Sequence, residues 1–197
     1  MMSTTCTAFA GTTLVASGAL PEVARQAKLA LDRDAWAQVL IFDDVTSEVI
    51  EVDFRGTPEE VERRPTEASA AVEASALPEE ARRPGRPRLG VVAREITLLP
   101  RHWEWLATQP GGASVALRKL VEQARNANQG ADRKRRAQES CYRFLSTMAG
   151  NEPGFEEATR ALFAGNLARF EEMSRAWPSD VRDHARRLAA VACTESS

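Results

Sequence analysis

Residues 94–125 read REITLLPRHWEWLATQPGGASVALRKLVEQAR, and this stretch determines the predicted fold. Its first residues, Arg94–Leu98, predict a short strand. Pro100 follows at once and is typical of the first position of a helix. The run Pro110-Gly111-Gly112 ends that helix, and a second helix is expected to start at residue 113 or 114. The middle of the chain is therefore predicted to fold in the order strand, helix, helix.

The predicted strand over 94–98 would leave backbone N–H and C=O groups unpaired on both of its edges. No second strand is expected nearby in the sequence, so we expect this strand to pair with its own copy across a two-fold axis. Such pairing gives an isologous homodimer, and a two-stranded ribbon fits the major groove of B-form DNA. The side chains expected to form the dimer are Ile96, Leu98, Trp103, Leu106, Leu117, Leu120 and Val121.

The central segment resembles the ribbon-helix-helix family of DNA-binding proteins. The matching residues are Ile96-Thr97-Leu98 before Pro100, and the pattern Gly-x-Ser-x-x-Leu-Arg-x-Leu-Val over Gly112–Val121. The resemblance implies that strand residues face the bases. With Ile96 and Leu98 pointing inward, the DNA-facing positions are Ala93, Glu95 and Thr97, of which only Thr97 suits general base contacts. The chain as a whole resembles an uncharacterised bacterial family, domain of unknown function 2239, which implies no activity.

Charged residues are unevenly distributed along the chain, although the net charge is only −2. Residues 1–81 carry 6 basic and 15 acidic side chains, whereas residues 82–143 carry 14 basic and 5 acidic ones. Residues 144–197 carry 6 and 8. This asymmetry indicates either a polyanion-binding middle or two parts of the chain that attract one another.

Two basic runs flank the predicted ribbon. The first, Arg82–Arg88, contains Gly-Arg-Pro, which resembles the core of an AT-hook and implies arginines in a narrow minor groove. The second, Arg133–Arg136, offers four cations to phosphates. The start of the second predicted helix offers backbone N–H groups to a phosphate. The residues expected to contact DNA are Arg83, Arg86, Arg88, Arg94, Thr97, Gly112, Ser114, Arg118, Arg133 and Arg135.

The flanking regions complete an α+β organisation. Residues 1–56 predict a ββαββ module, with hairpins over 6–18 and 38–54 and a helix over 20–34. Residues 57–88 lack large apolar side chains and predict a linker that ends in the basic arm. The ribbon-helix-helix-like unit occupies 89–129. Residues 130–197 predict further helices, with starts near Asp132, Pro153 and Pro178.

Several classes of protein are not expected from this sequence. The cysteines Cys6, Cys141 and Cys193 form no CxxC pair. Of the two histidines, His102 is interpreted as a structural or surface residue and His184, between Asp183 and Arg186, as an exposed one. No nucleophile, acid pair or glycine-rich phosphate loop is recognisable, so no enzyme, metal or cofactor is expected. Without an apolar run of membrane-spanning length, we expect a cytoplasmic protein.

The leading hypothesis is a bacterial homodimeric DNA-binding protein, and a role in transcription regulation follows from it. One alternative is a protein-interaction module that has kept the dimerising fold, with its basic middle masked by residues 1–81. A further alternative is a ligand-sensing or enzymatic role for the N-terminal module.

Overall fold

The structure, a computed structural model, describes residues 5–64, 92 and 94–193. The chain divides into two compact units. Unit 1 is drawn from residues 1–77 and 131–197, and unit 2 from residues 78–130. The predicted N-terminal module and C-terminal helices therefore pack together in unit 1. The fold is mixed α+β, as predicted.

Unit 1 is built on a three-stranded antiparallel sheet in the order β2-β1-β3. The strands are β1 (Thr5–Ala10), β2 (Thr13–Ala19) and β3 (Val39–Asp43). The predicted first hairpin is confirmed, and its turn contains Gly11 at φ +57°, where glycine carries no steric penalty. Helix α1 (Leu20–Arg33) follows β2 directly, with proline in its first turn as predicted.

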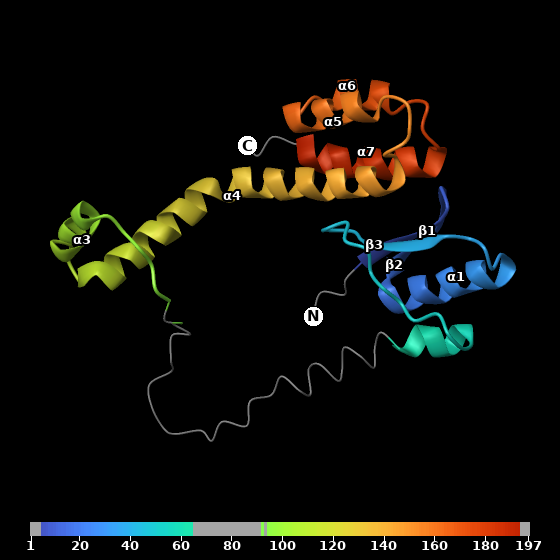
Figure 1. Cartoon of the computed structure of the whole chain (residues 1–197), viewed down its shortest axis with the longest axis horizontal. Coiled ribbons are helices and arrows are strands. Elements are labelled where there is room, and N and C mark those ends of the chain that lie inside the picture. Colours follow the sequence, from blue (N-terminus) through green and yellow to red (C-terminus); the bar gives the residue numbers. More distant parts are fainter. Residues whose placement is uncertain (1–4, 65–91, 93, 194–197) are drawn as a thin grey trace, which may run out of the picture. The chain divides into compact units, whose positions relative to one another are not determined.

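Each face of this sheet covers a separate apolar cluster. Cys6, Ala8 and Ile41 on one face pack with Val23 and Ala27 of α1. The other face meets the C-terminal helices, so that the sheet lies between α1 and these helices (Figure 1). Alternation of the strand side chains produces this division, because successive residues point to opposite faces.

The C-terminal helices of unit 1 begin with the second half of α4 (Gly112–Met148). They continue with α5 (Phe155–Ala164), α6 (Leu167–Met173) and α7 (Ser179–Cys193). Phe144 of α4 lies in the centre of the larger core, with ring centroids 5.6 Å from Phe9 and 5.2 Å from Phe42. Trp177 closes the far side, where its indole N–H donates to the Pro153 carbonyl at 2.9 Å.

The predicted fourth strand over Glu48–Phe54 is wrong, because these residues form only an isolated bridge between Phe42 and Val49. Ile50 N–H still donates to the Ile41 carbonyl at 2.8 Å. Beyond that point, a side chain replaces a strand partner: Arg64 donates to the carbonyls of Asp53 and Arg55. The side chains of this segment still alternate as in a strand, since Ile50, Val52 and Phe54 pack on the core.

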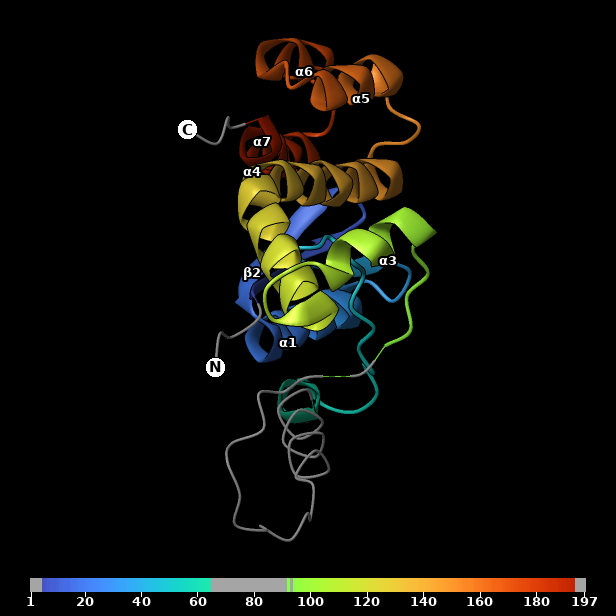
Figure 2. The same cartoon turned by 90° about the vertical axis from the view of Figure 1, so that its left-hand side faces the viewer.

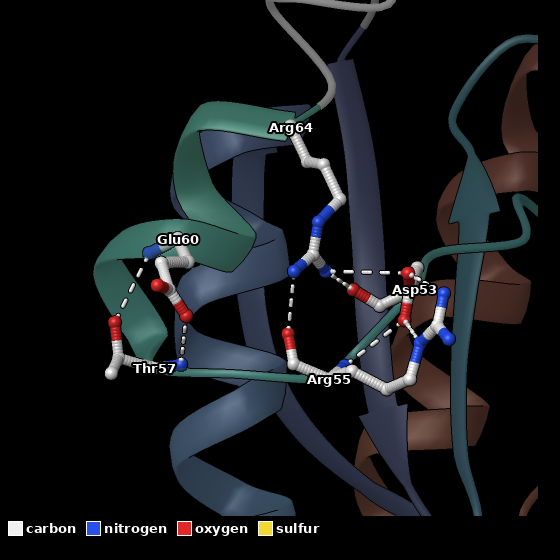
Figure 3. A network of polar contacts seen from close by, with 5 residues as sticks. All are labelled: Asp53, Arg55, Thr57, Glu60 and Arg64. Carbon is white, nitrogen blue, oxygen red and sulfur yellow. Dashed lines mark hydrogen bonds and ion pairs between the residues drawn. The ribbon is translucent and has the colours of Figure 1, made fainter.

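A helix occupies residues 58–64, where the sequence predicts the start of a linker. Thr57 and Glu60 form a capping box: Thr57 N–H donates to the Glu60 carboxylate at 2.8 Å, and Glu60 N–H to the Thr57 hydroxyl at 3.3 Å (Figure 3). Val61 is fully buried. The pattern Thr-x-x-Glu is a sequence signal for this helix start, which an interpretation based on composition alone misses.

Helix α4 runs without a break from Gly112 to Met148, whereas the sequence predicts two helices separated near Gly130. Gly130 is helical and does not have the positive φ that would end a helix. Asp132, the predicted cap of the second helix, instead pairs with Arg135 one turn further on, at 2.9 Å.

The prediction that His184 is exposed is wrong, because its side chain is only 5% exposed. The imidazole lies against Phe144 and Phe9, with centroid distances of 4.5 and 5.5 Å. Arg187 donates to its Nδ1 at 2.9 Å. Burial and then the nearby Arg187 charge lower the pKa of His184 to about 4. The charged neighbours Asp183 and Arg186 indicate an exposed position in the sequence, although His184 itself is buried on α7.

Acidification is expected to destabilise unit 1 through His184. The unfolded chain binds a proton near pH 6.5, whereas the folded chain binds it near pH 4. The resulting stability is complete above pH 6.5 and is lost as the pH falls toward 4. Between pH 7 and 5 the free energy of unfolding should fall by about 2 kcal/mol, as measured by urea unfolding. Equal losses in the wild type and in His184→Gln would contradict this assignment.

Candidate dimer and nucleic-acid interface

Unit 2 contains α3 (Pro100–Ala107) beside the first turns of α4, as Figures 1 and 2 both show. Pro100 opens α3 as predicted. The turn between the helices contains Gly111 at φ +84° and Gly112 at φ +75°. A Cβ on Gly111 would approach the Val115 side chain to about 3.1 Å. These glycines therefore permit the tight reversal that brings α3 against α4.

An open apolar groove of about 280 Å³ lies in unit 2. It receives side chains from the extended segment before α3, from α3 and from α4. Its lining consists of Leu98, His102, Trp105, Leu106, Leu117 and Leu120. Four of the predicted dimer residues therefore come together here: Leu98, Leu106, Leu117 and Leu120.

The other predicted dimer residues do not line this groove. Ile96 and Trp103 are about half exposed, and Val121 is 63% exposed. On α3, Trp105 lines the groove in place of Trp103, and it is about half exposed. The spacing His102, Trp105, Leu106 is i, i+3, i+4, which places these side chains on one helix face. That spacing could have identified the groove face of α3.

The core of unit 2 is very small. Among its described residues, only Leu106 and Ala116 are buried. Residues 121–129 of α4 are exposed on every side. Residues 94–99 adopt no regular secondary structure, so the predicted strand Arg94–Leu98 is not formed within the single chain. The backbone of this segment has no strand partner among the described residues.

The DNA-contacting candidates of unit 2 are all on its surface or at the turn. Arg94 and Thr97 are exposed in the segment before α3. Gly112 begins α4, and Ser114 lies exposed in its first turn. Arg118 is exposed one turn later, and its Nε donates to the Ser114 carbonyl at 3.1 Å.

The remaining basic candidates belong to other parts of the chain. Arg133 and Arg135 lie in unit 1, both exposed. Arg135 is held between Asp132 at 2.9 Å and Glu139 at 3.9 Å, which reduces its availability to a phosphate. Arg83, Arg86 and Arg88 lie outside the described residues. The predicted DNA contacts are therefore not gathered into one described site.

The described residues offer little for other chemistry. No group of three histidine, cysteine or acidic side chains among them could hold a metal ion. No helix in the part that the structure covers is both long and apolar enough to cross a bilayer. Burial raises the pKa of the Cys6 thiol to about 11 and that of Cys141 to about 12, so both thiols are unreactive.

Comparison with known proteins gives one match. A family described as "Uncharacterized protein conserved in bacteria (DUF2239)" matches residues 5–189. No curated protein and no solved structure matches the chain.

Proposed function

The chain belongs to the bacterial DUF2239 family, and we propose that it is a homodimeric DNA-binding protein with a role in transcription regulation. Two copies would meet through unit 2, around the groove lined by Leu98, His102, Trp105, Leu106, Leu117 and Leu120. The ribbon-helix-helix arrangement, in which the two 94–98 segments pair, is part of this proposal.

The main observation in favour of a dimer is the small core of unit 2, in which only Leu106 and Ala116 of the described residues are buried. A domain of about 60 residues is already marginal when it buries about 60% of its unfolded surface. The described part of unit 2, residues 92 and 94–130, buries too little apolar surface to offset its own conformational entropy of folding. Additional burial against another molecule would supply what is missing.

A second copy is the favoured occupant of the groove. The extended segment Arg94–Leu98 has a free backbone edge, and an antiparallel pair of identical strands satisfies both copies equally. The same two-fold contact would cover Leu98 at the end of the segment and Leu120 on α4. One symmetric contact would therefore address both deficiencies of unit 2, the unpaired backbone and the uncovered apolar side chains.

DNA is the favoured ligand because of charge. The described part of unit 2 exposes the cations Arg94, Arg101, Arg118, Lys119 and Arg125, against three acidic side chains, Glu95, Glu104 and Glu122. Of these five cations, only Arg125 has a carboxylate partner among the described residues, Glu122 at 3.5 Å. A dimer would double this excess of positive charge. Cations of this kind contact phosphates without selecting a sequence.

The strand positions support phosphate binding more than base reading. Leu98 lines the groove, so in a strand the neighbouring Thr97 would point to the opposite side, together with Glu95. Thr97 can bond to bases, whereas the Glu95 carboxylate repels phosphates. We therefore propose a protein whose affinity comes mainly from phosphate contacts.

Fluorescence anisotropy with random and AT-rich duplexes tests this function on the full chain. We expect micromolar binding in 50 mM salt that weakens at least about tenfold in 200 mM salt. Arg118→Glu should weaken binding about tenfold, because each copy loses a cation and gains an anion. Arg175→Glu makes the same charge change at an exposed position of unit 1 and should have little effect.

Two results would contradict the proposal. One is absence of binding in 50 mM salt, and the other is an equal effect of Arg118→Glu and Arg175→Glu. A dimer that binds no duplex would favour the alternative of a protein-interaction module.

A further inference from the structure

Among the described residues, His102 is the one ionisable side chain in the lining of the unit 2 groove, whose other members are leucines and a tryptophan. We propose that protonation of His102 controls dimerisation, with the dimer favoured when the imidazole is neutral. This inference rests on the proposed function, because it assumes that a second copy covers the groove. It adds that protonation regulates dimerisation at this site.

The groove offers no compensation for a charged imidazole. Covering it would remove water from His102, and an ion transferred out of water is strongly disfavoured unless it is paired. No carboxylate of the part of the chain that the structure describes lines the groove. A neutral imidazole, by contrast, is an amphipathic ring that tolerates contact with leucine and tryptophan side chains.

The charged residues around the groove do not reverse this preference. On α3, Glu104 lies about 200° around the helix from His102, on the opposite face, and Arg101 is its neighbour in sequence. Glu95 is exposed in the segment before α3. On α4, Arg118 and Lys119 lie away from the direction of Leu117 and Leu120. None of these described charged side chains lines the groove, so none compensates an imidazolium there.

Symmetry makes the effect steep. An isologous dimer contains two copies of the groove, so two imidazoles must lose their protons when the dimer forms. Proton linkage then raises the dimer dissociation constant by up to about 100-fold for each pH unit below the titration midpoint. Because imidazoles titrate between pH 5 and 8, we expect an increase of at least about tenfold from pH 7.5 to pH 5.5.

An effect of pH on dimerisation between pH 7.5 and 5.5 is simple to assign to a histidine of this chain. The chain has only two histidines, and burial lowers the pKa of the other, His184, to about 4. His184 therefore stays neutral in the folded protein between pH 7.5 and 5.5. A change in dimerisation over this range is therefore not caused by His184.

Sedimentation equilibrium of the full chain, free of any histidine tag, tests the inference at pH 7.5, 6.5 and 5.5. The wild-type dissociation constant should rise at least about tenfold over this range. His102→Gln, which cannot take up a proton, should give the same dissociation constant at all three values. His102→Lys, which carries a permanent charge, should dimerise weakly throughout.

The outcomes separate the two proposals. A monomer at every pH and at high concentration overturns the dimer and with it the proposed function. A dimer whose dissociation constant does not change with pH overturns only the role of His102. A wild-type pH effect that persists in His102→Gln also overturns it. A cooperative thermal unfolding transition of unit 1, followed by circular dichroism at each pH, establishes that the variants are folded.

Discussion

Leu120→Asp is expected to convert the proposed dimer into a monomer, raising the dissociation constant at least about 1,000-fold. Leu120 lines the groove and is 42% exposed in the single chain, so a second copy that covers the groove would bury the rest of this side chain. Each copy would lose roughly 2 kcal/mol of apolar burial and gain a buried charge without a partner. Size-exclusion chromatography with light scattering measures the change.

A matched control uses the same substitution chemistry at an exposed apolar residue of unit 1. Trp36 is 94% exposed in the turn between α1 and β3, and its indole supports no core. Trp36→Asp should leave the association state of the protein unchanged. If Leu120→Asp and Trp36→Asp had the same molar mass, both dimeric, the groove would not be the interface.

Dimerisation should also determine whether unit 2 is folded. A helix that is exposed all round gains little from packing, and isolated helices of 12–15 residues are marginal in water. Residues 121–129 of α4 are in that position in the single chain. In Leu120→Asp, the helical circular-dichroism signal should therefore fall together with the molar mass. In the wild type, the helical signal should fall as the protein is diluted and the dimer dissociates.

Local patterns were sufficient to predict much of unit 1. Proline before an apolar 3.6-residue repeat placed α1, and the alternation around Gly11 placed the first hairpin. The fourth strand failed for a non-local reason: Arg64 occupies carbonyls of residues 53 and 55 that a neighbouring strand would have needed. The prediction for His184 failed similarly, because the surface that its imidazole contacts is formed by Phe9 of β1 and Phe144 of α4, both far away in the sequence.

The candidate site was predicted in part. The leucines of the groove follow from helical spacing, and the sequence indicated their association. Trp103 is expected at the dimer interface, whereas Trp105 is the tryptophan that lines the groove, because α3 is only two turns long and either of its faces could meet α4. Turn geometry at Gly111 and Gly112 decides between those faces, and spacing alone does not describe it.

Phe144→Ala is expected to lower the free energy of unfolding of unit 1 by about 3–5 kcal/mol. Phe144 is fully buried, and its ring contacts Phe9, Phe42 and His184, which come from the sheet and from α7. Truncation leaves a cavity at the point where these elements meet α4. The midpoint of thermal unfolding, followed by circular dichroism, should fall by about 10 °C.

Phe163→Ala is the matched control, because it removes the same atoms from the end of α5. Phe163 is about half exposed and contacts Tyr142 at a centroid distance of 5.8 Å, so its loss should cost less than about 1 kcal/mol. The difference between the two variants measures burial at the centre of unit 1 against burial at its surface. Equal losses would mean that α4 and α7 do not pack on the sheet through Phe144, and the described core would then be wrong.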